Sequence, residues 1–85
     1  MNKLTAEQLF EIITQCAGED ESVSFDGASL DVKFNDLGYD SLALLETAGR
    51  ISRDFDIQLS DDAVTDTRTP RSLLELVNKS IAEAA

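Results

Sequence analysis

The sequence has no histidine and no tryptophan, and only one cysteine and one proline among its 85 residues. Without histidine, neither a Ser-His-Asp nor a Cys-His catalytic site can form. Without a Cys/His cluster, no conventional zinc site is available. No glycine-rich phosphate loop is present, and the acid-rich stretches, such as Asp61 and Asp62, lack the spacing of a calcium-binding loop. The chain is therefore predicted to bind no metal and not to be an enzyme.

The single cysteine, Cys16, excludes an internal disulfide and suits a reducing compartment. It follows Ile12 and Ile13 on an apolar helical face, which favours a buried structural thiol over a reactive one. No apolar run is long enough to span a bilayer. The first residues, Met-Asn-Lys-Leu-Thr, lack the apolar stretch of a signal peptide. We therefore expect a cytoplasmic protein that does not enter a membrane.

Basic residues are scarce, with 7 Lys and Arg against 17 Asp and Glu, and the net charge is −10. Between Leu4 and Gly49 the only base is Lys33. All four arginines and Lys79 come later in the chain. This balance opposes binding to nucleic acid and to anionic membrane surfaces. It favours basic protein partners, which a negative field steers toward the chain. A solvated surface without a specific partner would show the same charge.

Apolar residues at helical spacing predict an all-α fold with three longer helices and a short one. The first helix is expected to begin near Thr5, which forms a capping box with Gln8, and to end at Gly18. A long connection of residues 18–39 follows, with scattered apolar residues that we expect to dock onto the bundle. These residues are Val23, Phe25, Leu30, Phe34 and Leu37.

The second helix is expected to begin at Asp40 or Ser41 and to run to about Phe55. Glycine costs about 1 kcal/mol against alanine inside a helix, so Gly49 indicates close packing, a flat surface needed there, or simple tolerance. A loop over residues 56–60 should turn Ile57 and Leu59 inward.

A short helix over 61–66 follows this loop, capped by Ser60. The last helix begins at Pro70 with Thr69 as its cap, because proline suits the first helical position. The whole of 1–85 is predicted to form one domain.

Ser41 is the residue with the most chemical interest. It lies where a glycine-containing loop meets a helix start, and there unpaired backbone N–H groups and the helix dipole favour an anionic phosphate. We expect Leu42 and Leu45 to anchor this turn in the core while Ser41 points outward. The chain offers no base to activate the hydroxyl, so Ser41 suits a group delivered by another enzyme. The alternative is that Asp40 or Ser41 only caps the helix.

The segment around Ser41 resembles the phosphopantetheine attachment motif of acyl carrier proteins, Leu-Gly-x-Asp-Ser-Leu followed by a glutamate. Leu37, Gly38, Asp40, Ser41, Leu42 and Glu46 occupy those places. The resemblance extends over nearly the whole chain and implies a four-helix bundle with a long first loop and a short third helix. It also implies a 4'-phosphopantetheine group on Ser41, flanked by Asp40 and Leu42, that carries acyl groups as thioesters.

The second helix carries Arg50 and Arg53, whereas fatty-acid carriers usually have a strongly acidic second helix. The run from Gly38 to Thr47 is instead similar to carriers of type II aromatic polyketide synthases, as are Ala17-Gly18-Glu19 and Thr69-Pro70-Arg71. This resemblance implies a carrier of malonyl and growing polyketide chains in antibiotic biosynthesis. A fatty-acid carrier and an unmodified acidic adaptor with the same fold remain alternatives.

Arg71 and Asn78 lie seven residues apart, in one sector beside Leu74 at about 100° per residue. Both side chains can donate hydrogen bonds to the carbonyl oxygens of a polyketone chain, and the resemblance favours them as cargo contacts. Alternatively, Arg71 covers the rim of the apolar stripe and Asn78 faces water.

Partners follow from the resemblance. Glu46 and Asp40 are predicted to face basic partner enzymes. The implied partners are a phosphopantetheinyl transferase, a malonyl-loading acyltransferase, the ketosynthase with its chain-length factor, and a ketoreductase or cyclase. The chain itself is expected to be a monomer.

Overall fold

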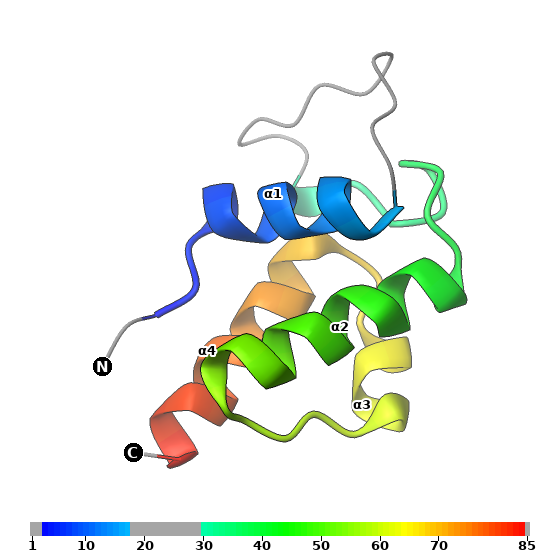
Figure 1. The fold of residues 1–85 in the computed structure, drawn as a ribbon. Coiled ribbons are helices and arrows are strands. Elements are labelled where there is room, and N and C mark those ends of the chain that lie inside the picture. The colour runs from blue at the N-terminus through cyan, green and yellow to red at the C-terminus, as the bar shows by residue number, and fades with distance from the viewer. Residues whose placement is uncertain (1–2, 18–29, 85) are drawn as a thin grey trace.

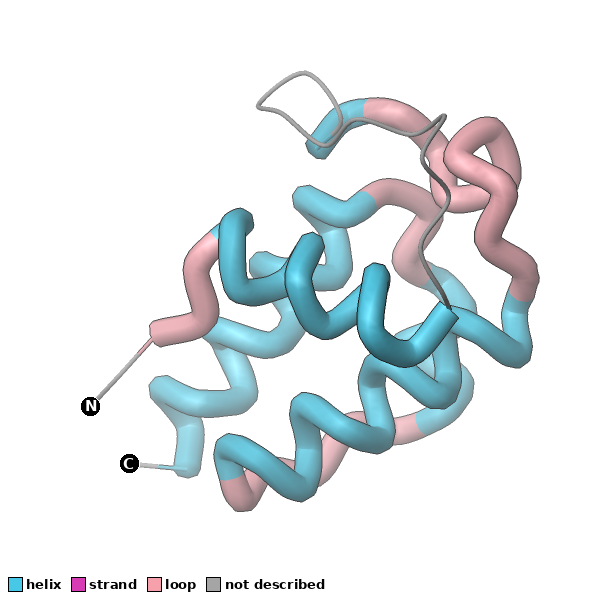
Figure 2. The backbone as a smooth tube through the Cα atoms, turned by 45° about the horizontal axis from the view of Figure 1, so that its top comes forward, coloured by secondary structure: helices cyan, strands magenta, loops and turns pink. Residues whose placement is uncertain are grey.

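The computed structural model describes residues 3–17 and 30–84, except for the side chains of residues 16 and 17. Four helices account for the regular secondary structure of these ranges (Figures 1 and 2). They are α1 (Ala6–Ala17), α2 (Ser41–Phe55), α3 (Asp61–Asp66) and α4 (Pro70–Ala84). The predicted all-α bundle with a short third helix is confirmed.

The helix starts lie where polar caps predict them. Thr5 and Gln8 form the capping box, with the Gln8 N–H donating to Thr5 Oγ1 at 3.2 Å and the Thr5 N–H donating to Gln8 Oε1 at 3.0 Å. Ser60 Oγ accepts from the Ala63 N–H and so caps α3. Thr69 Oγ1 accepts from the N–H of Ser72 in the first turn of α4. Each cap satisfies a backbone N–H that has no partner inside its helix.

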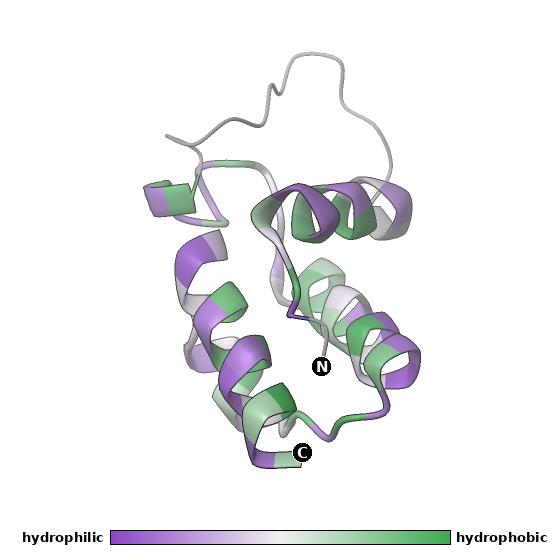
Figure 3. Ribbon diagram, turned by 90° about the vertical axis from the view of Figure 1, so that its left-hand side faces the viewer, coloured by the Kyte–Doolittle hydropathy of each residue, from purple (hydrophilic) through white to green (hydrophobic). Residues whose placement is uncertain are grey.

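The core lies where α1 packs against α2 and α4, and α3 closes one side by packing against the same two helices. Each longer helix places hydrophobic residues along one side and hydrophilic residues along the other (Figure 3). Leu9, Ile51, Leu73 and Val77 are fully buried at the centre of this core. Ile57, in the loop between α2 and α3, is buried as predicted, and Leu59 packs partly against the core.

The described part of the long connection docks onto the bundle. Phe34 is buried, and Leu30 and Leu37 pack partly against the core. The Phe34 N–H donates to the carbonyl oxygen of Arg68 at 2.8 Å, which fastens this segment to the link between α3 and α4. These predicted docking residues are therefore confirmed. The interpretations that concern Gly18, Val23, Phe25 and the Cys16 thiol lie outside the described residues.

One prediction about α2 is wrong, and one of the alternatives for Gly49 is excluded. Leu42 does not anchor the first turn, because its side chain is 66% exposed. The buried face of α2 runs through Leu44, Ala48 and Ile51, and Leu42 lies about 200° around the helix from Leu44. Close packing does not explain Gly49 either, since a Cβ built there would meet no atom within 4 Å.

Candidate functional site

Ser41 is the first residue of α2, and its side chain is exposed. Asp40 caps the helix in an extended conformation, and its Oδ1 accepts from the Ala43 N–H at 2.9 Å. The structure thus assigns the capping role to Asp40 and leaves the Ser41 hydroxyl outside the cap. The alternative that Ser41 itself caps α2 is excluded by this arrangement.

The turn before Ser41 is fixed by buried aromatic rings and by one glycine. Tyr39 and Phe34 are both buried, and the Tyr39 N–H donates to the Phe34 carbonyl oxygen at 2.9 Å. Gly38 has a φ of +88°, a backbone conformation that a side chain at this position would strain. The turn therefore holds the start of α2 firmly and presents Ser41 on the surface.

The surroundings of Ser41 favour modification over catalysis. The Ser41 hydroxyl has no hydrogen-bond partner among the residues that the structure describes, and the chain has no histidine. No base is therefore in place to remove its proton. The first turn of α2 still offers backbone N–H groups and the positive end of the helix dipole, which favour an attached phosphate.

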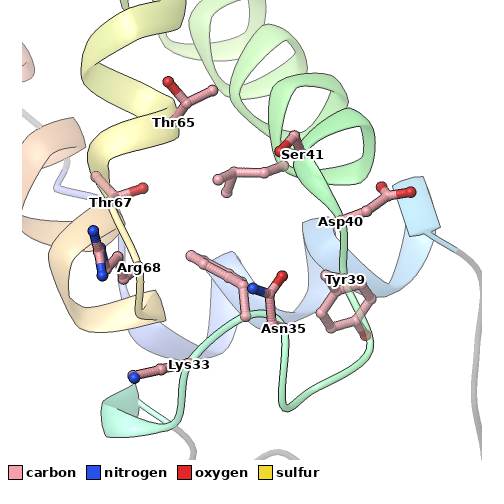
Figure 4. A pocket seen from close by; sticks show the side chains of 10 residues that line it. Lys33, Asn35, Tyr39, Asp40, Ser41, Thr65, Thr67 and Arg68 are labelled. Atoms are coloured by element: carbon pink, nitrogen blue, oxygen red, sulfur yellow. The ribbon is translucent and has the colours of Figure 1, made fainter.

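A pocket of about 260 Å³ opens beside Ser41. Figure 4 shows Ser41 and Asp40 on one side and Thr65, Thr67 and Arg68 on the other. The pocket thus lies between the start of α2, the end of α3 and the link to α4. A flexible group attached to the Ser41 oxygen would have room to lie along it.

The exposed first turns of α2 also present the predicted recognition residues. Leu42 and Glu46 are both exposed and lie one helical turn apart, so they share a face. This face therefore offers a partner an apolar side chain, Leu42, next to an acidic one, Glu46. The exposed position of Leu42 therefore suits contact with a protein partner and does not suit the core anchor that was predicted from the sequence.

Arg71 and Asn78 both have partners within the chain. Arg71 donates to Asp31 through Nε at 2.7 Å and Nη2 at 3.3 Å. The Asn78 amide forms two hydrogen bonds with the backbone of Leu4, at 2.8 Å and 3.1 Å. The alternative that Asn78 faces water does not hold, because its side chain is half-buried and hydrogen-bonded to the backbone of Leu4.

The Arg71 pair predicts a measurable acid titration. The hydrogen bond from Arg71 holds the pKa of Asp31 below its ordinary value of 3.8. Since this folded-state pKa is depressed, any stabilisation by the pair is present above pH 3.8 and is lost as the pH falls through the lower, folded-state value. Carboxyl-carbon NMR should show Asp31 titrating at higher pH in Arg71→Gln than in the parent. The same titration midpoint in both proteins would contradict the pairing.

Comparison with known proteins decides the family. A family model described as a phosphopantetheine attachment site matches residues 7–77. The oxytetracycline polyketide synthase acyl carrier protein of Streptomyces rimosus is 51% identical over 85 residues, covering 100% of this chain and 90% of the relative. The chain belongs to the acyl carrier proteins of polyketide synthases. The granaticin polyketide synthase acyl carrier protein of Streptomyces violaceoruber is 49% identical, with both chains covered in full.

Solved structures of such carriers have the same fold. The 3,5-dioxohexyl form of the actinorhodin carrier from Streptomyces coelicolor, described as a triketide mimic, superposes with a TM-score of 0.90 at 42% identity. That match covers 99% of this chain and 98% of the other. The oxytetracycline carrier superposes with a TM-score of 0.84 at 50% identity, covering 100% and 90%.

This acyl carrier protein transports polyketide intermediates on a phosphopantetheine arm and catalyses no reaction itself. The described residues fit such an arm, since an exposed hydroxyl at a helix N-terminus lies beside an open pocket. It works with polyketide synthase enzymes and with a phosphopantetheinyl transferase. In the described ranges no group of three His, Cys, Asp or Glu could hold a metal ion, and no helix is long and apolar enough to cross a membrane.

Sequence reasoning missed two features of the site. The predictions did not include Asp31 as the partner of Arg71, or Arg68 as a wall of the pocket. Both features join segments far apart in the chain, and no local motif marks such a contact. The one signal in the sequence was the excess of acids in the first half, with all arginines in the second half. It indicates that acids and arginines can pair, but it does not identify which residues do so.

Proposed function

We propose that Ser41 carries the phosphopantetheine arm through a phosphodiester, and that residues 1–85 act as one carrier domain for malonyl and polyketide thioesters. The observation that carries this proposal is the exposed Ser41 hydroxyl beside the pocket, which has no hydrogen-bond partner in the ranges 3–17 and 30–84, with Asp40 already used as the cap. In the loading step Ser41 Oγ forms a bond to phosphorus as the phosphoanhydride of coenzyme A breaks. The hydroxyl proton passes to the transferase, and adenosine bisphosphate leaves.

The intact mass of the protein tests this proposal. After incubation with coenzyme A and a broad-specificity phosphopantetheinyl transferase, the protein should gain one phosphopantetheinyl group. Peptide mapping should place that group on Ser41. A folded protein that gains no mass with several transferases would favour the unmodified acidic adaptor. A group found on another serine would overturn the site assignment.

The names of the relatives, and the group attached to one of them, favour the polyketide pathway over fatty-acid synthesis. Their names place them in polyketide synthases, and one solved relative carries a triketide mimic. We propose as partners the malonyl-loading acyltransferase, the ketosynthase with its chain-length factor, and a ketoreductase or cyclase, all acting in the cytoplasm on a monomeric carrier. Transfer assays with polyketide and fatty-acid ketosynthases would separate the two pathways.

Glu46 is proposed to guide basic partners to the start of α2. Glu46→Lys should slow loading by the transferase several-fold, because exposed charges steer association. Its melting temperature should stay nearly unchanged, since single exposed charges contribute little to stability. Glu83→Lys is the matched control: Glu83 is also exposed and belongs to the C-terminal end of α4, and Figure 1 shows this end of α4 well away from the start of α2. A double-digit fall in the melting temperature of Glu46→Lys would mean that Glu46 is structural.

Arg71 and Asn78 remain proposed contacts for the carbonyl oxygens of a polyketone cargo. Arg71 uses Nε and Nη2 on Asp31, and Asn78 uses one of its two amide N–H groups on Leu4, so a cargo carbonyl must either accept from a remaining N–H or replace one of these partners. Replacing Asp31 by a cargo oxygen costs little at Arg71, because both members of this ion pair are exposed. We therefore propose Arg71 as the first of the two to meet cargo. An Arg71→Ala carrier with the same cargo-dependent NMR shifts as the parent would contradict this order.

A further inference from the structure

Two of the seven basic residues, Lys33 and Arg68, line the pocket beside Ser41. They come from different parts of the chain, the connection before α2 and the link between α3 and α4. The hydrogen bond from the Phe34 N–H to the Arg68 carbonyl oxygen, at 2.8 Å, places these two backbone segments next to each other. Figure 4 shows Lys33 and Arg68 on the side of the pocket across from Ser41.

Neither cation is neutralised by an acid of the described chain. The ion pairs found there are Arg50–Asp54 and Arg71–Asp31, and neither includes Lys33 or Arg68. Among the described residues that line the pocket, the one carboxylate is that of Asp40, which accepts a hydrogen bond from the Ala43 N–H. In Figure 4 the Asp40 carboxylate points away from Arg68. Within the described residues of a protein with a net charge of −10, this pocket thus keeps a positive wall.

The two threonine hydroxyls of the pocket have no proton left to donate to an anion. Thr65 Oγ1 donates to the Asp62 carbonyl oxygen, and Thr67 Oγ1 donates to the Val64 carbonyl oxygen. Each hydroxyl has a single proton, so both keep only acceptor lone pairs for the pocket. Lys33 and Arg68 are therefore the charged donors that this wall offers, and charge-assisted hydrogen bonds to oxyanions are the strong ones.

We propose that Lys33 and Arg68 bind an oxyanion that belongs to the group attached at Ser41. This proposal rests on Ser41 as the attachment site. Two parts of the loaded carrier supply such an anion: the phosphodiester next to Ser41, and the free carboxylate of a malonyl thioester. In either case the two cations hold the arm in the pocket by its charge. If the anion is the malonyl carboxylate, the carrier distinguishes malonyl from acetyl cargo, which has no charge.

The experiment compares apo, phosphopantetheinyl, acetyl and malonyl forms by NMR, each with its loading verified by intact mass. The variant is Lys33→Met with Arg68→Met, which removes both charges and keeps the backbone carbonyl that accepts from Phe34. The control is Arg53→Met with Lys79→Met, which removes two exposed charges outside the pocket. The readouts are the ³¹P shift of the phosphodiester and the amide shifts of Phe34 and Thr67.

A malonyl carboxylate in the site predicts amide shifts at Phe34 and Thr67 that differ between the malonyl and acetyl forms. This difference should fall by at least half in the pocket variant and persist in the control. A phosphodiester in the site predicts that the amide shifts of Phe34 and Thr67 already change between the apo and phosphopantetheinyl forms. This change should fall by at least half in the pocket variant, where the ³¹P shift should also differ from that of the parent. A malonyl group should then have no further effect. The proposal is overturned if neither difference falls more in the pocket variant than in the control. Failure of the proposed attachment site would appear earlier, as missing mass.

Discussion

Ser41→Ala should gain no phosphopantetheinyl mass under conditions that load the parent protein completely. Alanine removes the exposed hydroxyl at the start of α2, which the Asp40 cap leaves unused. Asp40 keeps its hydrogen bond to the Ala43 N–H, so the helix start should survive the change. Ser41 is exposed, and its removal should alter the free energy of unfolding by less than about 0.5 kcal/mol, as is usual for surface substitutions.

A second serine in a helical first turn provides the matched control. Ser72 is exposed and lies in the first turn of α4, three residues after Thr69, whose hydroxyl is 3.0 Å from its own. Ser72→Ala makes the same chemical change at a comparable helix position, without the neighbouring Gly38 turn and pocket. It should load as fast as the parent. Equal loss of loading in both variants would mean that the transferase fails for another reason, and full loading of Ser41→Ala would overturn the assignment.

Local signals in the sequence were enough to predict most of the helical framework. The capping pair of Thr5 and Gln8, the Ser60 cap and the Thr69-Pro70 start each act within four residues, so their physics is visible in the sequence. Periodicity predicted which residues line the core because a helix repeats every 3.6 residues.

Contacts between distant segments explain where sequence reasoning stopped. Leu42 was misplaced because α2 also carries apolar residues outside its buried face, and only the packing of α1 and α3 against α2 selects that face. The hydrogen bond between Phe34 and Arg68 and the pair of Asp31 with Arg71 each depend on the folded topology. Such contacts have no repeat or motif that the sequence alone would show.

Asn78→Leu should destabilise the fold more than any other site substitution considered for cargo binding. Asn78 Oδ1 accepts from the Leu4 N–H, and its Nδ2 donates to the Leu4 carbonyl oxygen. Leu4 is only 2% exposed, so its backbone groups would lose partners where water is scarce. Each unsatisfied buried group costs about 1–3 kcal/mol, and we expect a loss of about 2–4 kcal/mol in the free energy of unfolding by urea titration.

Graded replacements keep this prediction open to contradiction. Asn78→Asp retains an acceptor for the Leu4 N–H and loses the donor to its carbonyl oxygen, so it should fall between the parent and Asn78→Leu. Asn35→Leu is the control, because it makes the same substitution at an exposed asparagine. Stability equal to that of the parent in Asn78→Leu would show that Leu4 does not depend on the amide.

The same hydrogen bonds decide how a role of Asn78 in cargo binding can be recognised. A combined Arg71→Ala and Asn78→Ala protein loses a clamp on Leu4 together with two hydrogen-bond donors, so weaker cargo protection could reflect a loosened fold. If a polyketone displaces Leu4 from the Asn78 amide, the bonds to Leu4 open in the loaded carrier. The Leu4 amide proton should then exchange faster with solvent when the cargo is a polyketone than when it is butyryl. Equal exchange with both cargoes would mean that the polyketone does not displace Leu4 from Asn78, and would favour Arg71 as the cargo donor.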